Sequence, residues 1–440
     1  MFNKSENGWV APAAVFAAAL GARLAFTLAH GPAPLIAEMN AYWDAAGGLL
    51  AGIGFHAGHG FRAFIPPGYA FFLAAVRGLG GTPFTARIVQ DFLGAGTGLL
   101  LFYYIRRPFG LKAAFLGSLA FAVWAPSLAI GDFVLTESLF TFLLLATLLL
   151  WGNGDSRAHA LGAGLIGGAA ALSRELALLF FPAIALSYLL TRDYKRALNA
   201  ILAGIIVIIC VAPWTVRNWR VLGGFVPVTS KSNVDFFIYN HNSFDQILYN
   251  ESDQPGEKRL FADATSEIGL AHLAQKRGLA WIVAHPGLFV FKGFRTEANF
   301  FGLERDFFQH QKYGYFPPLP PWLLWLLVPI FLVPSAAALP LAFLGAIRFG
   351  RNPHLKAATA IVILYVIVTF AAYSFTRQRY PLTPIIIAFA VGALASRREM
   401  WHWLKERPWR WVTAAAFSSF LLAAWALEIS LDLKDFGGTG

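Results

Sequence analysis

Two carboxylates stand in the stretch LIAEMNAYWDAAGGLLAGIGF, residues 35–55, of a chain that otherwise carries little charge. Positioned carboxylates can exchange protons with a reacting group, so these two are the first candidates for chemistry. One stripe of a short helix would hold Glu38, Tyr42, Ala45 and Leu49, which follow the spacing i, i+4, i+7 and i+11. Asp44 falls on another face, where we expect it to contact water. The alternative for Glu38 is an ordinary surface residue that faces water or lipid headgroups.

The composition indicates a helical protein that crosses the membrane many times. Of the 440 residues, 57% are hydrophobic and 13% are charged, against about 25% charged residues in an ordinary soluble domain. Much of the net charge of +11 lies in short loops such as YYIRRPFGLK, TRDYKR, RFGRNPHLK and RREMWHWLKERPWR. The positive-inside rule assigns such loops to the cytoplasm, so we expect membrane lipids around the chain and no nucleic-acid partner.

Apolar windows predict one all-α transmembrane domain over residues 1–440 with about eleven spans. They are roughly 9–29, 85–105, 113–130, 136–152, 158–173, 176–190, 197–213, 322–347, 357–374, 381–396 and 410–428. The first is expected to be an uncleaved helix rather than a signal peptide. Two long loops, 30–84 and 214–321, fall on the outer face, opposite the basic loops. In the first, the stripe that begins at Glu38 and the segment IPPGYAFFLAAVRGL predict helices lying at the membrane surface.

The same topology sorts the polar residues. The outer face receives nearly all the carboxylates and the polar connections GDFVLTE, LSRELA and FTRQRY. We therefore expect any chemistry to occur on the outer face.

Several segments together resemble the GT-C membrane glycosyltransferases. They are EMNAYWDAAGGLLAGIGF, IPPGYAFFLA, ARIVQDFLGAGTGLLLFYYIRR, VLTESLFTFLLL, LSRELALL, APWTVRNWRVLGGFVPV and RQRYPLTPIIIAFA, in this order. The branch they resemble includes the bacterial protein O-mannosyltransferases and the aminoarabinose transferase of lipid A. The resemblance implies transfer of a sugar, with inversion, from a polyprenyl-phosphate donor to a lipid, glycan or protein acceptor. It also implies a bacterial inner-membrane protein whose active site faces the periplasm.

The resemblance also implies roles for the acids. Glu38 stands where that family usually has an aspartate, four residues before a tyrosine, and would act as the catalytic base. Glu137 in LTESLF matches the second family acid, and would orient the region of Glu38 or bind a divalent cation such as Mg or Mn. Its alternative is a first-turn acid that complements the helix dipole. Asp132 is the substitute candidate for the metal, and no organic cofactor is expected.

Cations are expected near the outer interface, because the leaving group is a lipid phosphate. Arg174, Arg217 and Arg379 match family patterns, although Arg174 could simply pair with its neighbour Glu175. Arg62 is a weaker candidate, because Ile65 occupies the place directly before Pro-Pro where the family often has a basic residue. For all of them the alternative is an interfacial anchor that extends toward headgroups. The same motifs add Tyr42, Tyr69, Asn218 and Tyr380 as expected substrate contacts.

Three other readings stay open. His56 and His59 could bind a metal, but a histidine pair with no nearby acid is a weak signal. A transporter or flippase of lipid-linked sugars would need ionisable residues along a path through the membrane, where only Arg23 is a candidate. An inactive scaffold of the same fold is the third.

Overall fold

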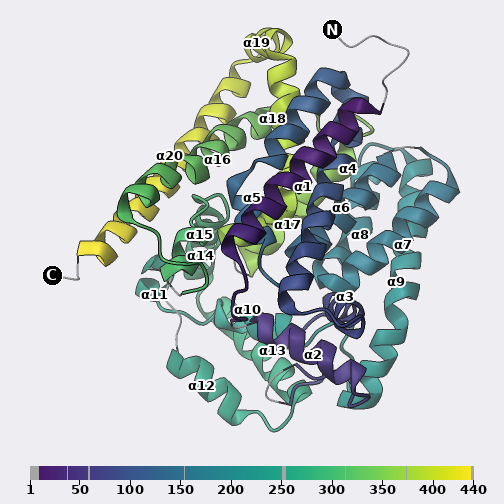
Figure 1. Cartoon of the computed structure of the whole chain (residues 1–440), viewed down its shortest axis with the longest axis vertical. Helices are drawn as coiled ribbons and strands as arrows, with labels where there is room; N and C mark the ends of the chain where they lie inside the picture. The colour runs from purple at the N-terminus through teal and green to yellow at the C-terminus, as the bar shows by residue number, and fades with distance from the viewer. Residues whose placement is uncertain are drawn as a thin grey trace.

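The computed structural model describes residues 9–36, 38–57, 60–152, 154–249, 254–312, 314–372 and 374–437. Over these residues every regular element is a helix, and the one β-type pairing is an isolated bridge between Ala57 and Phe61. The prediction of an all-α membrane protein is confirmed. The long helices form a bundle, with α19 (Arg397–Lys405) at one end and several short helices at the other (Figure 1).

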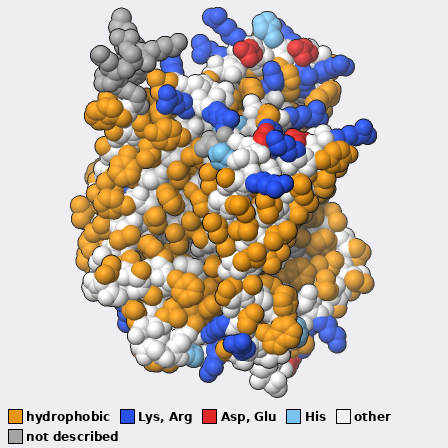
Figure 2. Space-filling model, turned by 90° about the vertical axis from the view of Figure 1, so that its right-hand side faces the viewer, with side chains coloured by type: hydrophobic (Ala, Val, Ile, Leu, Met, Phe, Trp, Pro, Cys, Tyr) orange, Lys and Arg blue, Asp and Glu red, His pale blue; other side chains and the backbone are white. Residues whose placement is uncertain are grey.

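Six helical segments of the described chain are long and apolar enough to cross a membrane. They are α1 (Val10–His30), α4 (Pro83–Ala122), α9 (Tyr194–Leu222), α16 (Pro321–Phe349), η2 (Thr376–Leu382) with α18 (Thr383–Ala395), and α20 (Pro408–Gly437). Three shorter apolar segments are α6 (Glu137–Gly152), η1 (Glu175–Leu179) with α8 (Phe180–Leu189), and α17 (Lys356–Ala371). The helix α7 (Arg157–Ser173) packs against α6 and α9. Apolar side chains cover the middle of one face of the bundle, and Lys and Arg gather toward its ends (Figure 2).

Two predicted spans end at different residues in the structure, and one predicted boundary is a break within a single helix. The predicted span 113–130 stops at Ala122, because the chain turns at Trp124 and a separate helix, α5 (Ala125–Gly131), restarts with Pro126 in its first turn. The predicted span 197–213 continues through Pro213 to Leu222, since a proline is tolerated inside a long membrane helix. The predicted boundary between 85–105 and 113–130 is a break within α4 at Gly110, whose φ of 82° favours glycine.

The helices α16 and α18 approach each other closely at a glycine. A Cβ atom added to Gly345 would lie 2.3 Å from the carbonyl oxygen of Phe389, which belongs to the backbone of α18 and cannot swing away. This helix pair therefore depends on the missing side chain.

We expect the Gly345→Ala variant to unfold at a lower temperature, because overpacking a tight contact costs about 1–3 kcal/mol. Gly21→Ala is the matched control, since Gly21 lies in α1 with nothing within 4 Å of the added Cβ. The control should gain about 0.5–1 kcal/mol, the usual effect of replacing a helical glycine. Thermal unfolding in one detergent measures both. Equal melting temperatures for the two variants would contradict the close approach.

The outer loops of the prediction are helical and lie together at the end of the bundle away from α19 (Figure 1). The first contains α2 (Glu38–Leu50), which packs on α3 (Pro67–Gly78). The second contains α10 (Lys231–Ile238), α11 (Phe244–Tyr249), α12 (Gln254–Asp263), α13 (Glu267–Ala284), α14 (Pro286–Phe300) and α15 (Asp306–Lys312). The helix α10 packs on α13, and its first residue contacts the first residue of α2.

Candidate functional site

Glu38 lies in a charged network with two cations from distant parts of the chain. The Lys231 ammonium donates a hydrogen bond to one carboxylate oxygen of Glu38. The Arg377 guanidinium lies 3.5 Å from the other oxygen. The Glu38 side chain is 41% exposed, so the carboxylate is accessible while both of its oxygens face a cation.

Arg377 also connects this pair to the second predicted acid. Its Nε lies 3.4 Å from an oxygen of Glu137. The same oxygen accepts a hydrogen bond of 2.7 Å from Arg174, whose Nε donates to the Thr136 hydroxyl at 2.9 Å. The Glu137 side chain is only 3% exposed, and its other oxygen has no hydrogen-bond partner within the described chain. Arg174 thus pairs with Glu137 and not with its neighbour in sequence.

The five charged residues share one position in their helices. Glu38, Glu137 and Lys231 are the first residues of α2, α6 and α10, Arg174 directly precedes η1, and Arg377 is the second residue of η2. A helix N-terminus carries a partial positive charge and unpaired N–H groups. The two carboxylates are stabilised there, and the site as a whole has the polarity that binds anions.

Three cations and two carboxylates are joined by ion pairs in this network, and Asp235 adds a further negative charge beside Lys231. Burial alone would raise the pKa of Glu38, but the positive charges of Lys231 and Arg377 lower it to about 2. Burial would lower the pKa of the Lys231 ammonium, but the charges of Asp235 and Glu38 raise it above its ordinary value. Both groups are therefore fully charged near neutral pH.

Two tyrosines form the apolar side of the site. Tyr42 is buried one turn after Glu38, and its ring packs edge-on against Tyr69 with 5.3 Å between the centroids. Burial and the charges of Glu38 and Glu137 raise the pKa of Tyr42. The Tyr69 hydroxyl donates a hydrogen bond to the side chain of Gln90, and this bond fixes the orientation of the Tyr69 ring.

The structure places three other predicted residues outside the network. Arg217 donates hydrogen bonds to the backbone carbonyls of Arg62 and, at 3.2 Å, Phe55. The buried Asn218 amide donates to the carbonyls of Val226 and Val228. The Arg62 side chain is exposed, and its backbone N–H donates to Glu267 at 2.6 Å. These residues join loops to the end of α9.

Arg379 also lies elsewhere, and Arg377 stands where Arg379 was expected. The Arg379 guanidinium is 1% exposed, donates to the carbonyl of Gly302 at 3.1 Å and lies 3.3 Å from Glu304. Tyr380 is buried in the same apolar cluster as Tyr42 and Tyr69. Lys231 and Arg377 are the two network residues that the sequence patterns did not single out. Ile65 occupies the place where the resemblance expects a basic residue. This was the sequence signal that another residue supplies the cation.

The residues around Glu137 do not fit a divalent cation. Such an ion needs about six oxygen ligands, whereas the Glu137 oxygen that is engaged faces two arginines. Asp132 belongs to a separate buried cluster, in which it accepts from Arg87 at 2.6 Å and contacts His30 at 2.6 Å. No group of three or more metal-binding side chains occurs among the described residues. His56 contacts the Ile53 carbonyl, and His59 lies outside the described residues.

Comparisons with known proteins place this geometry in context. Residues 65–216 match the family model of dolichyl-phosphate-mannose-protein mannosyltransferases. The oligosaccharyltransferase of Archaeoglobus fulgidus, solved with Zn and sulfate, is 12% identical with a TM-score of 0.54, covering 94% of this chain and 52% of that chain. The chain has the GT-C fold. It spans about half the length of the oligosaccharyltransferase structures that it matches.

Two further structures resemble the chain. The Archaeoglobus fulgidus enzyme AglB with an inhibitory peptide and a dolichol-phosphate is 12% identical with a TM-score of 0.51, covering 96% of this chain and 55% of that chain. ArnT from Cupriavidus metallidurans bound to undecaprenyl phosphate is 16% identical with a TM-score of 0.43, covering 89% and 78%. The comparison with curated proteins gave no match. In this GT-C fold, the charged network occupies the starts of five helical elements.

Proposed function

We propose that the chain is a membrane glycosyltransferase that moves a sugar from a polyprenyl-phosphate donor to a lipid, glycan or protein acceptor. The observation that carries the proposal is the network in which Arg377 bridges Glu38 and Glu137 beside Lys231 and Arg174. Its three cations at helix N-termini suit a phosphate leaving group. The structural relative solved with dolichol-phosphate supports this class of donor.

In the proposed reaction the donor phosphate binds Lys231, Arg377 and Arg174. An acceptor hydroxyl attacks the anomeric carbon, the new carbon–oxygen bond forms, and the bond from that carbon to the phosphate oxygen breaks. The attack inverts the anomeric centre, and the polyprenyl phosphate leaves with the electron pair of the broken bond. Glu38 accepts the hydroxyl proton. Because a bound phosphate competes with Glu38 for Lys231 and Arg377, donor binding raises the pKa of Glu38 and strengthens it as a base.

The site is proposed to face the periplasm from the bacterial inner membrane. Support comes from the two ends of α6 and α7. Glu137 and Arg174 lie at one end, and the basic segments of α4 and α9 near Arg107 and Arg196 lie at the other. The positive-inside rule assigns the basic end to the cytoplasm.

The test uses the purified protein with a panel of polyprenyl-phosphate sugars and candidate acceptors. Mass spectrometry should detect free polyprenyl phosphate together with a glycosylated acceptor. A transporter would move the donor across a vesicle membrane and leave it intact. Intact donor with every sugar and acceptor of the panel would count against an enzyme.

A chelator should change the transfer rate by less than about twofold, because cationic side chains stand where a divalent ion would need oxygen ligands. The measurement compares rates after EDTA treatment with rates after Mg or Mn is added back. A tenfold loss that Mg or Mn restores would show that this reading of Glu137 is wrong.

A further inference from the structure

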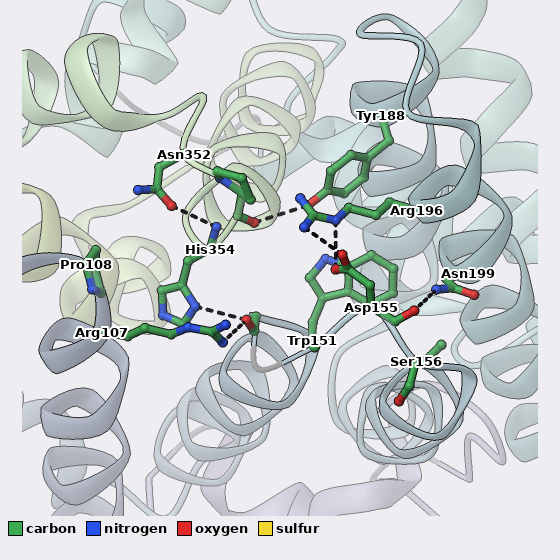
Figure 3. Close-up of a pocket in the computed structure, with 14 residues that line it drawn as sticks. Arg107, Pro108, Trp151, Asp155, Ser156, Tyr188, Arg196, Asn199, Asn352 and His354 are labelled. Carbon is green, nitrogen blue, oxygen red and sulfur yellow. Dashed lines mark hydrogen bonds and ion pairs between the residues drawn. The ribbon is translucent and has the colours of Figure 1, made fainter.

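A cavity of about 340 Å³ lies far from the charged network, at the other ends of α6 and α7. The 16 residues of α6 separate Glu137 from Gly152 by about 24 Å. The end of α6, the starts of α7 and α9, the end of α8, the break in α4 and the loop 352–354 surround the cavity (Figure 3). Its volume falls within the range of about 300–1,000 Å³ that is usual for ligand sites.

Three cations lie in or beside this cavity. The exposed Arg107 donates a hydrogen bond to the Gly152 carbonyl, and no ion pair is found for it within the described chain. Arg196 forms a bidentate pair with Asp155, with both contacts at 2.8 Å (Figure 3). The Lys356 ammonium lies 4.2 Å from the centre of the Tyr188 ring, which lines the cavity. Two carboxylates face these three cations, since Asp193 also lies 3.7 Å from Arg196 and acts on Lys356, so the cavity keeps a net positive charge.

The helix termini and the neighbouring surface narrow the class of ligand. Both α7 and α9 begin at the cavity, so the positive ends of two helices point toward it. The same turns of α8 and α9 carry strongly exposed apolar side chains, among them Leu190 at 76% and Leu198 at 62%. A ligand with a phosphate and an apolar tail could contact both surfaces.

We propose that this cavity binds the phosphate of an anionic phospholipid headgroup from the leaflet opposite the charged network. Arg107 makes the direct contact to the phosphate, since its charge is not already engaged by a carboxylate. The acyl chains lie along the exposed apolar side chains of α8 and α9. Basic pockets between membrane helices on the cytoplasmic side are typical sites for anionic headgroups.

The test measures lipid binding to the purified full-length protein by native mass spectrometry, with phosphatidylglycerol and phosphatidylethanolamine as probes. We expect phosphatidylglycerol to bind the wild type and Arg107→Gln to weaken that binding about tenfold, as for a lost charge-assisted hydrogen bond. Arg106→Gln is the matched control, because Arg106 is the exposed neighbour outside the cavity lining. Equal weakening by both substitutions would indicate a general surface charge effect and overturn the site.

A second measurement needs no variant. Hydrogen exchange of the wild type should slow in residues 154–160 and 192–199 in nanodiscs containing phosphatidylglycerol, relative to nanodiscs of phosphatidylcholine. Unchanged exchange there would overturn the proposal. Inorganic phosphate and glycerol 3-phosphate form the remaining arms. If either one protects these segments as well as the lipid does, the ligand is a soluble phosphate and the lipid assignment is wrong.

Discussion

Replacing Glu38 by glutamine lowers the rate of glycosyl transfer by about 100- to 10,000-fold, the usual contribution of a general base. The substitution removes the proposed proton acceptor but keeps the shape and the hydrogen-bonding oxygen of the side chain. It also frees Lys231 and Arg377 from a competing carboxylate, so the KM for the donor should stay the same or fall. A steady-state assay that follows polyprenyl phosphate separates the two effects.

The control for Glu38→Gln is Asp44→Asn on the same helix. Asp44 is exposed, and we expect this variant to retain the wild-type rate. Thermal unfolding should differ little among the three proteins, because the Glu38 carboxylate is 41% exposed and exposed pairs contribute little to stability. Transfer by Glu38→Gln at the wild-type rate would show that another group accepts the proton.

The two arginines of the motif RQRY should give opposite results. Arg377→Gln lowers the transfer rate about 100- to 1,000-fold with little change in stability, because it removes a cation from the partly exposed site at which the proposed reaction develops phosphate charge. Arg379→Gln destabilises the fold by about 3–5 kcal/mol, because it removes the cation that pairs with the buried Glu304 and the donor to a backbone carbonyl in the interior. Thermal unfolding and the transfer assay, measured on both variants, check this contrast.

Arg377→Lys tests whether the charge alone is sufficient, since lysine keeps the charge but cannot reach both carboxylates with a planar guanidinium. It should recover part of the lost rate. If Arg379→Gln lost transfer while unfolding at the wild-type temperature, Arg379 and not Arg377 would bind the phosphate.

The sequence predicted much of the helical framework because apolar length and charge distribution act locally. It also selected Glu38, Glu137 and Arg174, which the structure brings into one network. It could not select Lys231, which lies 193 residues from Glu38 in a segment without a regular apolar pattern. Pairing at that separation depends on how α10 packs on α13, and no local rule encodes it.

The directions of the Arg377 and Arg379 side chains could not be predicted from the sequence either. They stand two residues apart in η2, and a side chain's direction there depends on how the turn is rotated against its neighbours. One arginine faces the carboxylates and the other faces the interior. The helix ends at Ala122 and Leu222 were missed because the apolar windows ended at residues 130 and 213, whereas the chain turns at Trp124 and continues as a helix through Pro213.

The placement of Glu38, Glu137, Lys231 and Arg377 where loops become helices has an evolutionary consequence. The loops that precede these helices can change in length and composition while the first helical turns stay fixed to the bundle. If the proposed function holds, acceptor preference can therefore diverge between related enzymes through the loops, while the charges proposed to bind the donor phosphate are inherited unchanged. A lineage with this architecture can acquire new acceptors without rebuilding its chemistry.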